Sequence, residues 1–202
     1  MIKIENLNFE YTLGESIIQN FSYTFEEGNV YLVKGDNGSG KTTLIKLIIG
    51  LLKPKSGTIE LGDSSVISYL PDFNGIYYDL TVLDNVIFRL SLYKIKFSEK
   101  RNQFYELLEQ FNLKGKEKEL VKNLSLGMIK KVAVICTILV DSTIYILDEP
   151  TGGIDAESTE EILYLINKLS TKENIVICIS HETLLKQELK AIPLNLSDGG
   201  VN

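Results

Sequence analysis

The chain has 202 residues, of which 44% are hydrophobic and 24% are charged, a composition that suits one soluble α/β domain with a sizeable core. The formal net charge of −6 argues against a general nucleic-acid-binding protein, because such proteins carry a strongly basic surface. The sequence contains no apolar run long enough to span a membrane and no secretion signal at its start, so we expect a cytoplasmic protein. Cys136 and Cys178 lie among Val and Ile residues, and we expect buried, reduced thiols rather than a disulfide or a metal site.

Alternating apolar and polar residues predict strands in the first part of the chain. The pattern runs through residues 2–33, with turn-forming breaks at 13–15 and 26–29. We expect an antiparallel β-layer there. Tyr11, near the first break, is a candidate for stacking on a nucleotide base, although most strand tyrosines only cover a hydrophobic core.

A glycine-rich segment carries the strongest functional signal. It matches G-x-x-x-x-G-K-[ST], the phosphate-binding loop (P-loop) of nucleotide hydrolases. Its residues are Gly35, Asp36, Asn37, Gly38, Ser39, Gly40, Lys41 and Thr42, and Thr43 follows as a further candidate nucleotide contact. An apolar run at 30–33 predicts a strand before the loop, and the spacing over 43–49 predicts a helix after it. A chance glycine-rich turn is the alternative, and this strand–loop–helix context argues against it.

Each residue type in this loop has a physical role. The glycines allow successive backbone N–H groups to point inward, so that they form an anion-binding nest at the start of the following helix. Lys41 would reach the β- and γ-phosphates, and the Thr42 hydroxyl would bind the Mg²⁺ that accompanies the nucleotide.

The middle of the chain predicts a helical insertion. After short strands at 58–61 and 66–70, residues 72–140 show helical periodicity and no convincing strand. We therefore expect an α/β core formed by residues 1–71 and 141–202. The insertion contains a lysine-rich run from Lys94 to Lys122, for which we expect a solvated helical face, with a protein-partner surface as the alternative.

Strands and helices alternate again toward the carboxyl terminus. The predicted order is strand 143–147, helix 157–169, strand 175–179, a short helix and strand 192–196. Continuous apolar strands separated by helices indicate a parallel sheet covered on both faces.

Polar side chains follow two of these strands. Asp148 and Glu149 end the first, at the sheet edge where ligands bind, so Asp148 would hold Mg²⁺ and Glu149 would polarise a water for attack on the γ-phosphate. A charged strand end that meets solvent is the alternative. His181, the single histidine, follows the second strand, where its imidazole would reach a γ-phosphate; a purely structural histidine is the alternative.

With these pieces in order, the chain resembles the nucleotide-binding subunit of an ABC transporter over nearly its whole length. Residues 123–128, Asn-Leu-Ser-Leu-Gly-Met, are similar to the family signature L-S-G-G-Q. Further resemblances are to the extended Walker B segment (residues 147–151), the D-loop (152–155), the switch histidine (His181) and the adenine-stacking aromatic residue (Tyr11).

The resemblance implies a head-to-tail pair of ATPase subunits, identical or paralogous. ATP would lie between the P-loop of one subunit and the Ser125 and Gly127 region of the other. Opening and closing of the pair would be passed to a transmembrane permease through the helical insertion, which places the protein on the inner face of the membrane.

Three departures from the family pattern bear on activity. Asp72 stands where the family has the Q-loop glutamine; a carboxylate there would accept from a water on Mg²⁺ but would not donate as an amide does. Leu126 and Met128 replace Gly and Gln of the signature, which predicts weaker contacts between subunits and modest ATPase activity. The pair Gly152-Gly153 predicts a looser D-loop.

Two other functions remain open from the sequence. One is a soluble ABC-type ATPase that acts on ribosomes or DNA, and the other is a regulatory cassette with weak ATPase activity. Transport, with export as the expected direction, ranks first because the chain carries a single cassette without a coiled-coil insertion or an appended regulatory domain. We expect no nucleic-acid partner.

Overall fold

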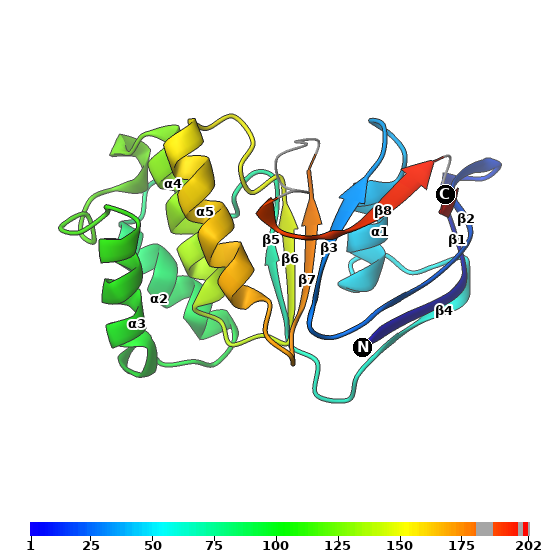
Figure 1. Cartoon of the computed structure of the whole chain (residues 1–202), viewed down its shortest axis with the longest axis horizontal. Coiled ribbons are helices and arrows are strands. Elements are labelled where there is room, and N and C mark those ends of the chain that lie inside the picture. Colours follow the sequence, from blue (N-terminus) through cyan, green and yellow to red (C-terminus); the bar gives the residue numbers. More distant parts are fainter. Residues whose placement is uncertain (181–187, 198–199, 202) are drawn as a thin grey trace.

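The computed structural model of the chain, described over residues 1–180, 188–197 and 200–201, is layered (Figure 1). An antiparallel sheet lies on one side, a larger sheet lies in the middle, and the helices of residues 82–169 lie on the other side. Within the described ranges, no helix has both the length and the apolar character needed to cross a membrane.

Three strands from the first third of the chain form the antiparallel sheet. β1 (Ile2–Thr12) pairs with β2 (Glu15–Phe25) on one edge and with β4 (Ser56–Leu61) on the other. The buried side chains of this sheet, which include Ile2 and Ile4 of β1 and Phe25 of β2, pack toward the rest of the molecule.

The second sheet is mixed and mainly parallel, in the order β5-β6-β7-β3-β8-β9. Its strands are β3 (Asn29–Lys34), β5 (Ile67–Leu70), β6 (Ile144–Asp148), β7 (Ile175–Ile179), β8 (Ile192–Ser197) and β9 (Gly200–Val201). Neighbouring strands run parallel from β5 to β8, and only the β8–β9 pair is antiparallel. The strand that leads into the glycine-rich loop, β3, therefore lies inside the sheet between β7 and β8.

Alternate residues of the central strands enter two different cores. Val30 and Leu32 of β3 belong to the core formed with the helices of residues 82–169. Tyr31 and Val33 belong to the core shared with the antiparallel sheet and α1 (Lys41–Ile48). Because both faces are covered, these strands are apolar at successive positions, as their sequences predict.

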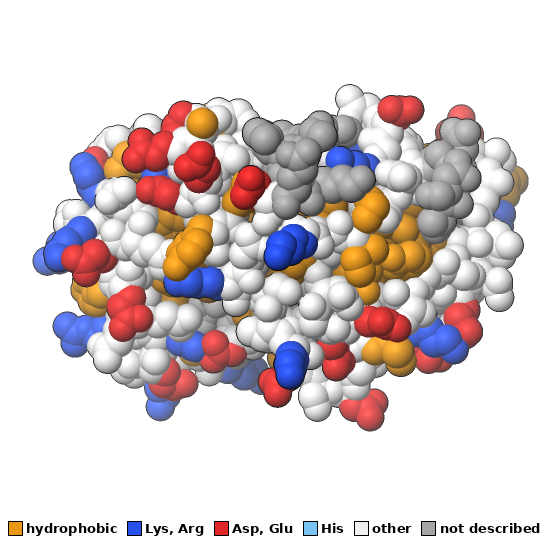
Figure 2. Space-filling model, viewed as in Figure 1, with side chains coloured by type: hydrophobic (Ala, Val, Ile, Leu, Met, Phe, Trp, Pro, Cys, Tyr) orange, Lys and Arg blue, Asp and Glu red, His pale blue; other side chains and the backbone are white. Residues whose placement is uncertain are grey.

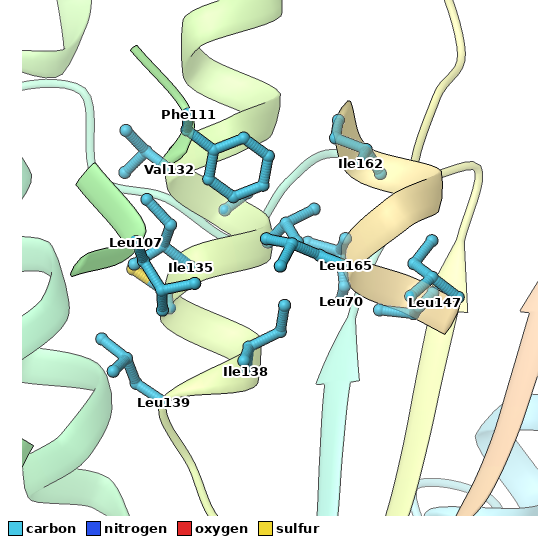
Figure 3. Packing of buried hydrophobic residues seen from close by; sticks show 14 of the residues in the cluster. Leu70, Leu107, Phe111, Val132, Ile135, Ile138, Leu139, Leu147, Ile162 and Leu165 are labelled. Carbon is cyan, nitrogen blue, oxygen red and sulfur yellow. The ribbon is translucent and has the colours of Figure 1, made fainter. Parts of the chain in front are cut away.

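The remaining helices cover the other face of the sheet. They are α2 (Val82–Leu92), α3 (Phe97–Gln110), the short 3-10 helix η1 (Val121–Asn123), α4 (Leu126–Ile138) and α5 (Ala156–Leu169). Figure 3 shows side chains of α3, α4 and α5 converging with Leu70 of β5 and Leu147 of β6. α4 lies at the centre of this packing, because 11 of its 13 residues are buried.

Three of these helices begin at a polar capping residue. The side chains of Thr81, Ser125 and Asp155 accept hydrogen bonds from the backbone N–H three residues later, at the starts of α2, α4 and α5. Each cap satisfies a backbone donor that has no partner inside the helix, which fixes where the helix begins.

The structure confirms the predicted α/β class, with one correction to the predicted β-layer. Residues 29–33, the last part of the predicted layer 2–33, belong to β3 in the parallel sheet, and β4 takes the third place in the antiparallel sheet. The reason is that β3 is apolar on both faces and requires cover on both. The short helix predicted between β7 and β8 falls in the region of residues 181–187, which lie outside the described residues.

Charged side chains of both signs are interspersed over the helical side of the molecule (Figure 2). In the lysine-rich run, Lys114 pairs with Glu109 and Lys116 pairs with Glu119, each at 2.7 Å. These exposed pairs fit the expected solvated face, and pairs of this kind contribute little to stability. Cys136 and Cys178 are both buried and free of disulfides, as predicted.

Candidate active site

The glycine-rich loop joins the carboxyl end of β3 to the start of α1. Gly35 has a φ of 150° and Gly40 a φ of 95°, both in the region that L-side chains rarely adopt. A Cβ atom at Gly35 would also lie well inside van der Waals contact with the Leu196 carbonyl oxygen of β8. Glycine at these positions thus lets the loop fold back and present the first turn of α1, an arrangement that suits a phosphate group.

Lys41 is buried within this loop. Its Nζ donates hydrogen bonds to the carbonyl oxygens of Gly35, at 2.7 Å, and Asp36, at 2.8 Å. Among the described residues, Ser39 Oγ is buried without a hydrogen-bond partner. The loop therefore holds a fixed positive charge and a polar oxygen that still has hydrogen-bonding capacity.

A cavity of about 570 Å³ opens over the loop. The predicted site residues that line it are Tyr11, Asn37, Gly38, Gly40, Lys41, Thr42, Thr43, Asp72, Asp148 and Glu149. The Tyr11 ring is 58% exposed, packs edge-on against Phe9, and its hydroxyl lies 3.3 Å from Thr43 Oγ1. The structure thus brings residues from four separate parts of the sequence to one cavity.

Asp148 lies buried at the end of β6. Burial and the neighbouring carboxylates of Asp72 and Glu149 raise its pKa from 3.8 to about 6, although Lys41 and Lys130 act in the opposite direction. Burial and the interaction with Asp148 raise the pKa of the Tyr69 hydroxyl to about 12. Asp148 therefore lies among carboxylates that oppose its ionisation.

Glu149 directly follows β6 in a left-handed backbone conformation, with φ of 48°. Its N–H donates to the Ile179 carbonyl oxygen at 2.9 Å. Its carbonyl oxygen accepts from Lys130 Nζ at 2.8 Å and from the Gly152 N–H at 3.3 Å. Lys130 Nζ also lies 3.3 Å from the Asp72 carbonyl oxygen, and burial lowers the pKa of this lysine while the nearby carboxylates oppose that effect.

The residues at the loop fit a magnesium ion that arrives with a nucleotide. Across the described residues, no group of three or more His, Cys, Asp or Glu side chains is arranged to hold a metal by itself. Mg²⁺ usually takes one or two protein ligands together with phosphate oxygens and water. The Thr42 hydroxyl and the Asp148 carboxylate on the cavity wall match that ligand set, and a divalent cation would offset the repulsion of Asp148 by the carboxylates of Asp72 and Glu149.

Other predicted site residues lie elsewhere. Gly35, Asp36 and Ser39 belong to the loop but are not among the lining residues of the cavity. Ser125 is exposed at the start of α4, whereas Gly127 is buried, and a Cβ atom there would lie 2.9 Å from Ser158 Oγ. His181 lies outside the described residues, so its role stays a prediction.

Sequence reasoning missed Tyr69 and Lys130. Tyr69 lines the cavity beside Asp148. Lys130 donates to the carbonyl oxygens of Asp72 and Glu149, two residues of the cavity wall. One signal was available for Lys130: it stands with Lys131 in the otherwise apolar stretch 129–136, where a charged residue requires a specific partner.

Together, this fold and this cavity define a P-loop nucleotide-binding ATPase. The model of the ABC transporter family matches residues 18–152. The chain belongs to this family and is an ATP-binding cassette, as its sequence predicts.

Known relatives support this assignment over the whole chain. The energy-coupling factor transporter ATP-binding protein of Thermotoga maritima is 31% identical over 210 residues, which cover 100% of this chain and 80% of that protein. The zinc import ATP-binding protein of Rickettsia conorii is 33% identical over 196 residues, which cover 95% and 82%. A solved dimeric bacterial ABC transporter cassette is 25% identical with a TM-score of 0.84, covering 100% and 97%.

Other relatives are longer. The chain covers 44% of an ABC transporter ATP-binding relative from Clostridium tetani and 43% of one from Methanosarcina mazei. The match to this chain is therefore less than half of each of those two proteins.

Proposed function

We propose that the chain binds ATP with Mg²⁺ and hydrolyses it to power transport, as one of two ATPase subunits attached to a membrane-embedded permease at the inner face of the cell membrane. The observation that carries this proposal is the cavity in which the glycine-rich loop faces Asp148 and Glu149. In this proposal, residues 72–140 act as a helical subdomain between the ATP site and the permease.

The nucleotide has a defined orientation in this proposal. The adenine stacks on the exposed Tyr11 ring, and the phosphates lie against the backbone N–H groups of residues 38–43 at the start of α1. Lys41, which already points across the loop, balances the charge of the β- and γ-phosphates. Thr42 and Asp148 hold Mg²⁺, which neutralises charge on the phosphates when it is bound.

Glu149 carries the chemical step. Its carboxylate orients a water and accepts a proton from it as the water oxygen bonds to the γ-phosphorus and the bond to the bridging oxygen of ADP breaks. His181 acts on the γ-phosphate in this scheme. Asp72, on the cavity wall, accepts a hydrogen bond from a water of the metal ion.

A second ATPase subunit completes the site. Ser125 and Leu126 at the start of α4 are exposed and do not line the cavity of their own chain, which leaves this helix end available to the nucleotide of another copy. The dimeric form of the solved cassette that is similar to this chain also supports the pairing.

An apolar groove supports contact with a permease. It has a volume of about 490 Å³ and lies among residues 67–77, the end of α1 and one side of α2. Phe73, 77% exposed, and Leu92, 63% exposed, stand on its walls, and large apolar side chains in such numbers mark an interaction surface. Tyr69 and Phe73 line both this groove and the ATP cavity, so one segment is in contact with both.

The test is the variant Glu149→Gln. The amide keeps the shape of the side chain and removes the proton acceptor, so hydrolysis should fall by about 100-fold or more while ATP binding remains. The variant should then run as a dimer in size-exclusion chromatography with MgATP and as a monomer without it.

The matched control is Glu106→Gln, an equivalent change on the exposed side of α3. It should hydrolyse ATP at the wild-type rate and show no lasting dimer. A Glu149→Gln protein that hydrolyses ATP normally and stays monomeric would contradict the proposed roles of Glu149 and of the second subunit.

A further inference from the structure

Lys130 and Lys131 are adjacent buried lysines that point to different parts of the molecule. Lys131 pairs with Glu161 of α5 at 2.5 Å. Lys130 instead donates to two backbone carbonyl oxygens, those of Glu149 and Asp72, and the residue is 4% exposed. A buried ammonium that contacts two carbonyl oxygens has given up hydration to reach that place, so its position calls for an explanation.

One of its acceptors is the strained residue at the end of β6. A non-glycine residue in the left-handed region is strained, and it persists only where neighbouring groups hold it. Among the described residues, three backbone hydrogen bonds hold Glu149. Its carbonyl oxygen accepts from Lys130 Nζ and from the Gly152 N–H, and its own N–H donates to the Ile179 carbonyl oxygen. Lys130 provides the only one of these three that comes from a side chain.

Its other acceptor lies on the segment that follows β5. The Asp72 carbonyl oxygen is 58 residues away from Lys130 in sequence, and the Glu149 carbonyl oxygen is 19 residues away. Lys130 therefore joins two separate walls of the ATP cavity to α4. Because α4 is buried on nearly every side, it holds the ammonium at a fixed place.

We propose that Lys130 is a positioning residue for ATP hydrolysis: it fixes the backbone of Glu149 and of the Asp72 segment, and so aims the Glu149 carboxylate. The same helix begins at Ser125, five residues earlier and roughly 7 Å along the axis. Ser125, at the helix end that faces the partner's nucleotide, and Lys130, which positions Glu149 of this chain, thus belong to one rigid helix and move together. The inference rests on the proposed function, in which Glu149 is the proton acceptor.

The experiment compares steady-state ATP hydrolysis of wild type, Lys130→Met and Lys130→Arg. The methionine keeps the length of the side chain and removes its donors, so kcat should fall by about 10-fold or more, while KM for MgATP changes by less than about 2-fold. Lys130→Arg keeps both charge and donors and should recover kcat to within about 3-fold of wild type.

Lys131→Met is the matched control, since it removes the neighbouring buried lysine and its ion pair with Glu161. It should lower the melting temperature but leave kcat within about 2-fold of wild type. If Lys130→Met does not fold, Lys130→Gln, which removes the charge and keeps a shorter donor, is measured against the same thresholds.

The positioning role would be overturned if the Lys130 variant kept a wild-type kcat, or if kcat fell equally in the Lys131 control. The proposed function is unaffected by either result, provided that Glu149→Gln still abolishes hydrolysis. Wild-type protein that hydrolyses no ATP would instead remove the proposed function itself.

Discussion

Lys41 and Lys130 occupy similar surroundings on two sides of the ATP cavity, yet they arise from the sequence in different ways. Each is a buried lysine at the side of Asp148, and each donates to two backbone carbonyl oxygens. The acceptors of Lys41 lie five and six residues away in the same loop. The acceptors of Lys130 lie 19 and 58 residues away. A contiguous motif thus builds one side of the site, and tertiary packing builds the other.

The largest expected effect distinguishes the two lysines by nucleotide binding. Lys41→Met removes a charge that would contact the phosphates directly, so hydrolysis should fall by about 100- to 1,000-fold. MgATP should raise the melting temperature of the wild type, and this rise should be absent in Lys41→Met. Differential scanning fluorimetry with and without MgATP measures the second effect.

Lys130→Met is the comparison for that measurement. It should keep the stabilisation by MgATP, because Lys130 contacts the backbone and not the nucleotide. An equal loss of nucleotide stabilisation in both variants would show that the two lysines have the same role.

Replacement of Asp148, which lies between the two lysines, should have a smaller effect, and this effect is on the free energy of unfolding. Its pKa is raised from 3.8 to about 6, so between these values the folded chain binds more protons than the unfolded chain, and stability falls as the pH rises. Asp148→Asn removes that loss. Without nucleotide or Mg²⁺, the variant should be more stable than wild type by about 3 kcal/mol at pH 7.5 and about half of that at pH 5.

Urea denaturation of both proteins at the two pH values checks this prediction, and hydrolysis should be lost in the variant at either pH. A stability difference that stayed the same from pH 5 to pH 7.5 would mean that Asp148 is as easily ionised in the folded protein as in the unfolded chain.

The smallest expected effect concerns the glycines that support each lysine's acceptors. Gly35→Ala forces a Cβ atom against the Leu196 carbonyl oxygen at an unfavourable φ, and it should lower the free energy of unfolding by about 2 kcal/mol. Gly152→Ala adds a Cβ atom 3.6 Å from Glu149 Cβ, an ordinary contact, and should change stability by less than about 0.5 kcal/mol. Urea denaturation compares the two variants, and equal losses would contradict the idea that Gly35 is more tightly confined than Gly152.

The sequence predicts those parts of the fold in which the signal is local. The apolar runs that became β6 and β7 are buried at every position, and the glycine-rich loop stands between its predicted strand and helix. The pairing of β4 with β1 could not be predicted from local sequence patterns. Pairing between strands about 50 residues apart depends on which edge the tertiary fold leaves free.

The same limit applies to the site. Asp148 and Glu149 were predictable because they end an apolar strand next to a P-loop motif, and Tyr11 because the family resemblance placed it there. Lys130 has no such context: its two acceptors are backbone atoms, which carry no side-chain signature in the sequence. Contacts of this kind become visible only when the chain is folded.

The contact between Gly35 and Leu196 also bears on how the protein is made. The ribosome adds Leu196 of β8 about 160 residues after Gly35, which takes on the order of ten to thirty seconds at typical elongation rates. During that interval β3 lacks its β8 neighbour, and the carbonyl oxygen that confines Gly35 is not yet in place. The glycine-rich loop of the nascent chain is therefore less constrained than the loop of the folded protein.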